Sequence, residues 1–165
     1  MRFIAAQIIG AFGIVILMIC FHFKNMKNVL KIKFLADVVW ATHYFLLGSD
    51  AAGISNTICC VREIIYMNKD KKIFKSNVWP FIFVGCNIFF GILGWKGIYS
   101  MLPATASVLA TFSFAQKDVK IARRIALIIN ILMFTYDIFV LSYMGMVSES
   151  LGFISVVAAM IINRK

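Results

Sequence analysis

The fold is decided by residues 34–69, which read FLADVVWATHYFLLGSDAAGISNTICCVREIIYMNK. Two apolar segments, each long enough to form a helix, flank a short turn from Gly48 to Asp50. Five polar side chains interrupt the apolar sequence, namely Asp37, His43, Asn56, Arg62 and Glu63. Ionisable side chains at membrane depth are costly, so they usually face a protein interior or an aqueous cavity and mark function. The stretch therefore predicts a membrane-spanning helical hairpin that carries functional side chains.

The composition is that of a membrane protein rather than a water-soluble domain. Of the 165 residues, 62% are hydrophobic and 15% are charged, and the mean hydropathy is +0.90. This leaves too little polar surface to cover a water-soluble globule. The formal net charge is +10, but the Lys and Arg residues occur in short tracts between apolar segments. Such tracts are typical of loops that set topology and contact anionic lipids, so we expect no nucleic-acid partner.

Seven apolar segments predict seven membrane-spanning helices. They lie at about residues 3–21, 32–47, 51–66, 78–95, 98–115, 125–143 and 146–162. The connections on one side carry fourteen Lys and Arg residues, with Lys24, Lys27 and Lys31 in the first basic loop. The other side carries only Arg2 and Lys96. Because basic loops stay in the cytoplasm, the N-terminus is predicted to lie outside and the C-terminus in the cytoplasm.

The chain also contains a diverged internal repeat. A shift of 93 residues places residues 4–69 on residues 97–162 without a gap, with ten identities such as Ser49 with Ser142. The predicted spans, turns and basic loops fall in register together, which is stronger evidence than the identities. Two three-helix repeats with one linker helix follow, at residues 1–77, 78–96 and 97–165. A single linker helix gives both repeats the same orientation, so the repeat axis lies along the membrane normal.

In the 93-residue alignment, polar residues within the apolar segments of the first repeat match polar residues of the second repeat. Asp37 and Tyr44 are seven residues apart and share a helix face, and Asn130 with Asp137 occupies the equivalent face in the second repeat. Polar groups that face each other across a repeat axis are typical of a central transport site. The predicted substrate-binding residues are Asp37, Trp40, His43, Tyr44, Asn56, Asn130, Tyr136, Asp137 and Glu149. The predicted bending points are Gly10 and Pro103, which align in the repeat, and Pro80 predicts a further kink.

Several of these residues also have a structural interpretation. Asp37 lies one turn from Lys33 and is then an interfacial carboxylate paired with that lysine. In this interpretation, His43 hydrogen-bonds to a neighbouring helix. The aromatic rings of Trp40, Tyr44 and Tyr136 only pack against other side chains.

The remaining charged residues have alternatives of the same kind. Arg62 and Glu63 are interpreted as a pair that snorkels near the cytoplasmic end of its span. Glu149 fits the outer mouth equally well. Asp137 is the hardest to explain structurally, because the surrounding segment is almost wholly apolar.

The sequence offers no catalytic or metal-binding pattern. The four cysteines all lie in apolar segments and lack the spacing of a metal site. Neither a Ser-His-Asp order nor a phosphate-binding glycine loop is found. We therefore expect a protein that is not an enzyme and that needs no metal or cofactor.

Short motifs give a family resemblance over nearly the whole chain. The segment WATHYFLLG from Trp40 to Gly48 and the segment SNTICCVRE resemble the YgjV-type family of bacterial inner-membrane proteins, as do Pro103 and Glu149 in the second half. That family is similar to the SWEET and PQ-loop superfamily, which includes the PnuC-type vitamin transporters. The resemblance implies a SWEET-like 3+1+3 transporter fold in the bacterial inner membrane. It implies no particular substrate.

The sequence departs from the PQ-loop pattern in two respects. It has no Pro-Gln pair, and Gly10 occupies the position that Pro103 has in the second repeat. The resemblance to SWEET-like carriers places Asn56 and Glu149 at the substrate, and the carboxylate argues against a neutral sugar.

Together these observations predict a uniporter or proton-linked carrier for a small polar metabolite, such as a sugar, a nucleoside or a vitamin-like compound. The alternatives are a non-transporting receptor or scaffold, and a lipid-handling protein for which openings between helices would be the sign. The expected partners are the substrate and anionic lipids at the cytoplasmic basic loops, and a homo-oligomer is left open.

Overall fold

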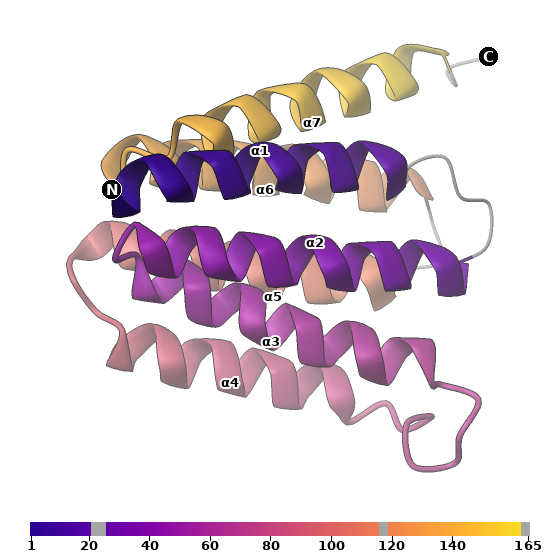
Figure 1. Cartoon of the computed structure of the whole chain (residues 1–165). Helices are drawn as coiled ribbons and strands as arrows, with labels where there is room; N and C mark the ends of the chain where they lie inside the picture. The colour runs from indigo at the N-terminus through magenta and orange to yellow at the C-terminus, as the bar shows by residue number, and fades with distance from the viewer. Residues whose placement is uncertain (21–25, 116–118, 163–165) are drawn as a thin grey trace.

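The computed structural model describes residues 1–20, 26–115 and 119–162, and within these ranges it contains seven α-helices and no strand (Figure 1). The helices are α1 (Arg2–Cys20), α2 (Met26–Leu46), α3 (Asp50–Met67), α4 (Trp79–Leu93), α5 (Met101–Ala115), α6 (Val119–Phe139) and α7 (Tyr143–Ile162). A short 3₁₀ helix, η1 (Ile98–Ser100), precedes α5. The predicted all-α class and the seven predicted helices are confirmed for this part of the chain.

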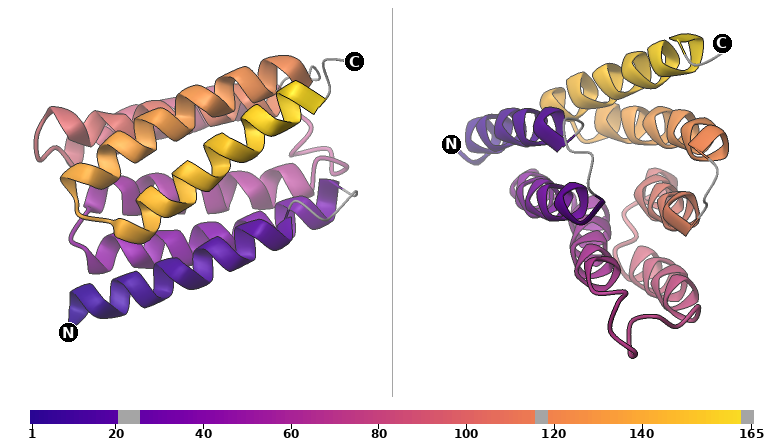
Figure 2. Two further views of the ribbon diagram at one scale, coloured as in Figure 1. Left: turned by 90° about the horizontal axis from the view of Figure 1, so that it is seen from above. Right: turned by 90° about the vertical axis from the view of Figure 1, so that its right-hand side faces the viewer.

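The helices lie side by side, and six of them form a ring of neighbours. Helix α2 packs between α1 and α3, and α6 packs between α5 and α7. Contacts of α3 with α5 and of α1 with α7 close the ring, whereas α4 lies outside it against α3 and α5 (Figure 2). The start of α1 and the end of α7 lie at opposite ends of the bundle (Figure 1). The ring is the feature that positions the candidate site.

The apolar and polar side chains are distributed as in a protein surrounded by lipid. Large apolar side chains are exposed on the outside, for example Phe12 at 63% and Phe81 at 70%. Charged side chains such as Arg62, Glu63 and Asp137 are fully buried. By length and hydropathy, the segment Arg2–Ile19 of α1 can cross a membrane, and three shorter apolar helical segments accompany it at Trp79–Leu93, Ile98–Ser113 and Tyr143–Ala158.

Two helices begin earlier than predicted. Helices α2 and α6 start at Met26 and Val119, six residues before the apolar segments that begin at residues 32 and 125. Hydropathy marks only the apolar part of a helix, whereas lysine stems can follow the helix surface and bring their ammonium groups to water. Lys27 and Lys31, predicted to lie in a loop, therefore belong to α2, while Lys24 is outside the described residues.

The turn between α6 and α7 also differs from its predicted place. Helix α6 ends at Phe139 rather than residue 143, and α7 begins at Tyr143 rather than residue 146. The Ser142 hydroxyl accepts a hydrogen bond from the Gly145 backbone N–H at 3.2 Å. A serine that caps the first turn in this way favours the earlier start of α7.

Both prolines lie in the first turn of a helix. Pro80 and Pro103 are the second residue of α4 and the third residue of α5. Proline is tolerated in the first turn because the backbone N–H groups there have no intrahelical partner. These positions explain how both prolines fit into helices, and the bending point predicted at Pro103 and the kink predicted at Pro80 stay predictions. Gly10 allows close packing instead, since an added Cβ atom would lie 2.7 Å from Met144 Cβ and 2.9 Å from His43 Nδ1.

Three helix boundaries in the first half of the chain recur at the predicted interval in the second half. Helix α2 covers residues 26–46 and α6 covers residues 119–139, which differ by 93 at both ends. Helices α3 and α7 start at Asp50 and Tyr143, again 93 residues apart. Two of the three described residues with positive φ obey the same interval, since Gly48 has φ +72° and Leu141 has φ +55°, whereas Gly97 has no such counterpart. Leucine rarely adopts this left-handed conformation, so the turn at Leu141 is imposed by its surroundings.

The same two turns share their backbone hydrogen bonds. Ser49 N–H donates to Tyr44 O at 2.8 Å, and Ser142 N–H donates to Asp137 O at 2.9 Å. Gly48 N–H donates to Phe45 O, and the equivalent bond in the second turn joins the residues 93 positions later. Two segments of different sequence thus form one turn geometry in register.

Exposed ion pairs connect the helices at both ends of the bundle. Lys96 pairs with Asp50 and also donates to Gly48 O at 2.7 Å, which ties the connection before η1 to the α2–α3 turn. At the other end Lys27 pairs with Asp70. The hydrogen bond from Lys27 lowers the pKa of the Asp70 carboxyl below its ordinary value of 3.8. This contact is therefore present at neutral pH and is lost as the pH falls through the lowered pKa.

Candidate functional site

A cavity of about 150 Å³ lies inside the helix ring. Its wall includes residues from all six ring helices, from Leu17 on α1 to Glu149 on α7. Five of the predicted substrate-binding residues line it: Asp37, Trp40, Tyr44, Asn56 and Glu149. Pro103, predicted as a bending point, also lines it. The wall is thus a mixture of carboxylate, amide and aromatic groups.

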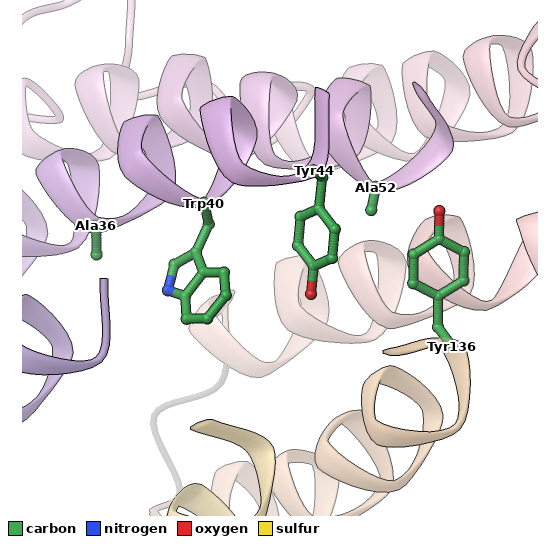
Figure 3. Close-up of a cluster of buried hydrophobic side chains, with 5 residues drawn as sticks. All are labelled: Ala36, Trp40, Tyr44, Ala52 and Tyr136. Carbon is green, nitrogen blue, oxygen red and sulfur yellow. The ribbon is translucent and has the colours of Figure 1, made fainter. Parts of the chain in front are cut away.

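A hydrogen bond between α2 and α6 lies beside the cavity. The Tyr44 hydroxyl donates to Asp137 Oδ1 at 2.7 Å, and both side chains are buried. The Asp137 carboxylate, which lies in an almost wholly apolar segment, therefore meets a polar partner on another helix. The two residues are 93 positions apart, so they are equivalent positions of the two segments that share the turn geometry. Figure 3 shows Tyr44 projecting from the same face of α2 as Trp40.

His43 holds the turn that precedes α7. Its Nε2 lies 2.7 Å from Ser142 Oγ, and its Nδ1 lies 2.7 Å from the backbone oxygen of Ala6. Because a backbone oxygen only accepts, Nδ1 carries the proton and Nε2 accepts from the serine hydroxyl. His43 is fully buried and outside the cavity wall, which agrees with its interpretation as a residue that hydrogen-bonds to neighbouring helices.

Tyr136 on α6 makes the equivalent contact to the turn that precedes α3. It corresponds to His43 in the 93-residue register, and its hydroxyl is hydrogen-bonded to Ser49, the counterpart of Ser142. Figure 3 shows the Tyr136 ring rising from α6 toward Ala52 at the start of α3. His43, Tyr136 and the Tyr44–Asp137 bond thus form one layer, which we call the closing layer, across the ring. Of these four residues only Tyr44 lines the cavity.

The opposite half of the cavity wall carries paired charges. Lys33 Nζ lies 3.0 Å from Asp37 Oδ1, as the structural interpretation of Asp37 predicted. Arg62 lies 3.0 Å from Glu63 Oε1 and donates to Thr111 Oγ1 on α5 at 3.3 Å. Within each pair, the positive charge therefore compensates the negative charge of its partner.

The predicted snorkelling of Arg62 and Glu63 is wrong. Their exposed fractions are 1% and 0%, so neither reaches the bundle surface. The reason is the helix face on which Arg62 lies, because Ser55, Cys59 and Arg62 recur at intervals of four and three residues and all line the cavity. That spacing was the signal in the sequence. Lys33 and Ser107 also line the wall and were not among the predicted site residues.

Asn130 lies behind Glu149 rather than in the central cavity. In the amide orientation that satisfies both groups, Asn130 donates to Glu149 Oε2 at 3.0 Å. Both residues line a second, more open cavity of about 290 Å³ between α6 and α7. Glu149 lines the two cavities together, so it is not a residue of the outer mouth alone. Asn56 donates one amide N–H to Ala52 O at 2.9 Å and lines the central cavity.

A match to a protein family covers almost the entire chain. Residues 4–164 match Imp-YgjV, a family described as bacterial inner membrane protein. The protein belongs to this family. It is therefore a helical protein of the bacterial inner membrane, and the buried charges described above lie within a membrane protein. Comparison with curated proteins and with solved structures gives no match.

The site geometry suits binding better than metal-dependent chemistry. Among the described residues, no group of three or more His, Cys, Asp or Glu side chains is placed to hold a metal ion. The central cavity offers hydrogen-bond donors and acceptors together with the Trp40 and Tyr44 rings. Such a wall can hold a small polar molecule that carries an apolar or aromatic part.

Proposed function

We propose that this protein is a transporter, which moves a small polar metabolite across the inner membrane by alternating access through the central cavity. The observation that carries the proposal is a cavity lined by residues of six helices of a membrane protein, with charged and aromatic side chains in its wall and the Tyr44–Asp137 bond beside it. Its volume of about 150 Å³ is on the order of one benzene-sized molecule. A sugar, a nucleoside or a vitamin-like compound then requires the cavity to widen during the transport cycle.

The proposal includes a SWEET-like arrangement of two parallel repeats. Helices α1–α3 form the first repeat, η1 with α5–α7 forms the second, and α4 is the linker, with boundaries at residues 1–77, 78–96 and 97–165. The common interval of 93 residues in helix boundaries, turn hydrogen bonds and positive-φ positions supports this division. The position of α4 outside the ring supports its role as linker.

Contacts between the two proposed repeats support alternating access. The Tyr44–Asp137 and His43–Ser142 bonds each join one repeat to the other. A rocking motion that separates the repeats at the closing layer breaks both bonds and opens the cavity on that side. The regions around Gly10 and Pro103 are the proposed bending points, because both lie where α1 and α5 contact this layer or the cavity.

Transport is tested by flux into proteoliposomes that contain the purified protein. We expect uptake of at least one radiolabelled compound from a panel of sugars, nucleosides and vitamin-like molecules, above the level in protein-free liposomes. Asp137→Asn keeps the shape of the side chain, so we expect it to fold and to reduce flux about tenfold by weakening a charge-assisted hydrogen bond. Asp70→Asn, in an exposed loop, is the matched control and should retain wild-type flux. Absence of flux with every compound would contradict the proposal.

A lipid-handling function is the second candidate, because an opening exists between two helices. The 290 Å³ cavity between α6 and α7 is lined mainly by apolar side chains. Movement of fluorescent phospholipid between leaflets of the same proteoliposomes, without metabolite flux, would favour this alternative. We find no specific observation that favours a receptor or scaffold.

The proposed topology places the N-terminus outside and the C-terminus in the cytoplasm, where the basic tracts contact anionic lipids. In a cysteine-free variant of the protein, a cysteine introduced at residue 165 should react with a membrane-impermeant maleimide only after the cells are permeabilised. A cysteine at residue 1 should react in intact cells. Labelling of residue 165 in intact cells would reverse the orientation.

A further inference from the structure

Among the described residues, Glu149 is the carboxylate that lines both cavities, namely the central cavity and the groove between α6 and α7. The groove opens on the side of the two helices that faces away from the ring, where Ile131 and Ile154 are exposed at 55% and 63%. In a membrane this side contacts lipid. Glu149 is therefore reached from the ring interior and from the bilayer.

Glu149 is also the carboxylate of the cavity wall that has no ion-pair partner at contact distance among the described residues. Lys33 pairs with Asp37, and Arg62 pairs with Glu63, each at 3.0 Å. Glu149 has no ion pair among the described residues, and its hydrogen-bond donor is the neutral amide of Asn130. An unpaired carboxylate in a lipid-facing groove is costly, and a cationic ligand group would remove that cost.

The groove next to Glu149 is suited to an apolar chain. Phe134 and Phe153 contribute aromatic walls, and the two hydroxyls of the groove are already satisfied within their own helices. Thr135 Oγ1 donates to Ile131 O at 2.8 Å, and Ser150 Oγ donates to Met146 O at 2.7 Å. Polar binding capacity is thus concentrated at Glu149 and Asn130, with apolar surface on the bilayer side.

We propose that Glu149 binds the ammonium group of an amphiphilic organic cation, whose apolar chain lies in the α6–α7 groove. This inference rests on the proposed function in that it names the substrate class of the same site. The cation reaches the carboxylate from the bilayer, and its ammonium group faces the central cavity. The Trp40 and Tyr44 rings of that cavity add cation–π attraction for a cation that moves inward.

Equilibrium binding to the intact protein in phosphatidylcholine nanodiscs tests the proposal, with empty nanodiscs as reference. The probes are octylammonium, octanol and octanoate, which share a chain and differ in charge, and butylammonium, which has a shorter chain. We expect octylammonium to bind about tenfold or more tightly than octanol, because a hydrogen bond to a charged partner is stronger than a neutral one. Octanoate should bind most weakly.

Three variants separate the contribution of the Glu149 charge to binding from that of the apolar groove. Glu149→Gln keeps the shape of the side chain and should abolish the preference for the cation, whereas Asp70→Asn removes an exposed carboxylate and should leave it intact. Ser150→Phe fills the groove and should weaken octylammonium more than butylammonium. A preference that persists in Glu149→Gln would overturn the proposal.

The remaining outcomes are equally decisive. If octanol binds as tightly as octylammonium, the groove binds lipid chains irrespective of charge. If octylammonium binds only after a dimer of the protein dissociates, the groove is covered by a second copy of the chain. Both results overturn the proposal. Cation binding without flux of any compound would support the cation site and contradict transport. Flux of a neutral compound without a preference for the cation would support transport and overturn the cation site.

Discussion

Replacing Arg62 by methionine is expected to destabilise the protein by about 3–5 kcal/mol or to prevent folding, because it leaves a buried carboxylate without its partner. Arg62 lies 3.0 Å from Glu63, whose side chain is completely buried. Methionine keeps much of the arginine volume, so the loss reports charge rather than packing. The free energy of unfolding in detergent micelles, measured by denaturant titration, gives the effect.

The double variant Arg62→Met with Glu63→Leu separates charge from packing. It removes both charges together, so we expect it to recover most of the lost stability. Lys96→Met, which breaks an ion pair whose side chains are both 48% exposed, is the control and should cost about 0–1 kcal/mol. A double variant as unstable as the single one would show that the pair is needed for packing. Recovery of stability without recovery of flux would assign Arg62 a role in the transport cavity as well.

The contact across the ring could be predicted because two independent regularities agree. The 93-residue register pairs Tyr44 with Asp137, and equivalent positions of parallel repeats approach each other near the repeat axis. The cost of a carboxylate in an apolar helix then requires a partner within reach. The all-helical class and the number of helices follow from hydropathy in the same direct way.

Other features depend on packing that no local pattern specifies. The partners of His43 lie 37 and 99 residues away, so neither Ala6 nor Ser142 could be assigned without the relative placement of α1, α2 and α7. Hydropathy places the starts of α2 and α6 too late in the sequence, because the charged first turns of these helices are helical without being apolar. The spacing of Ser55, Cys59 and Arg62 places Arg62 on one face of α3, but only the packing of that face against α5 determines that Arg62 is buried.

Removal of the Tyr44 hydroxyl is expected to open the cavity on the side of the closing layer. Cys59 lines the cavity and is a native reporter of access once Cys20, Cys60 and Cys86 are replaced by alanine. Tyr44→Phe removes the 2.7 Å bond to Asp137 without changing the ring. A buried hydrogen bond contributes about 1–1.5 kcal/mol, which corresponds to an increase of roughly five- to tenfold in the open population. Labelling of Cys59 by an impermeant maleimide from the outside of intact cells should accelerate by that factor.

The matched control is Tyr143→Phe, which removes the same atom from a residue that is 50% exposed at the start of α7. It leaves the closing layer intact, so the outside labelling rate of Cys59 should equal that of the single-cysteine parent. An unchanged rate in Tyr44→Phe would mean that the Tyr44–Asp137 bond does not control access. A rate that rises only from the cytoplasmic side would place the closing layer at the opposite membrane face and contradict the proposed orientation. An increase from the outside alone is the result that alternating access requires, because a bond between the two repeats can hold the cavity shut only on the side where they meet.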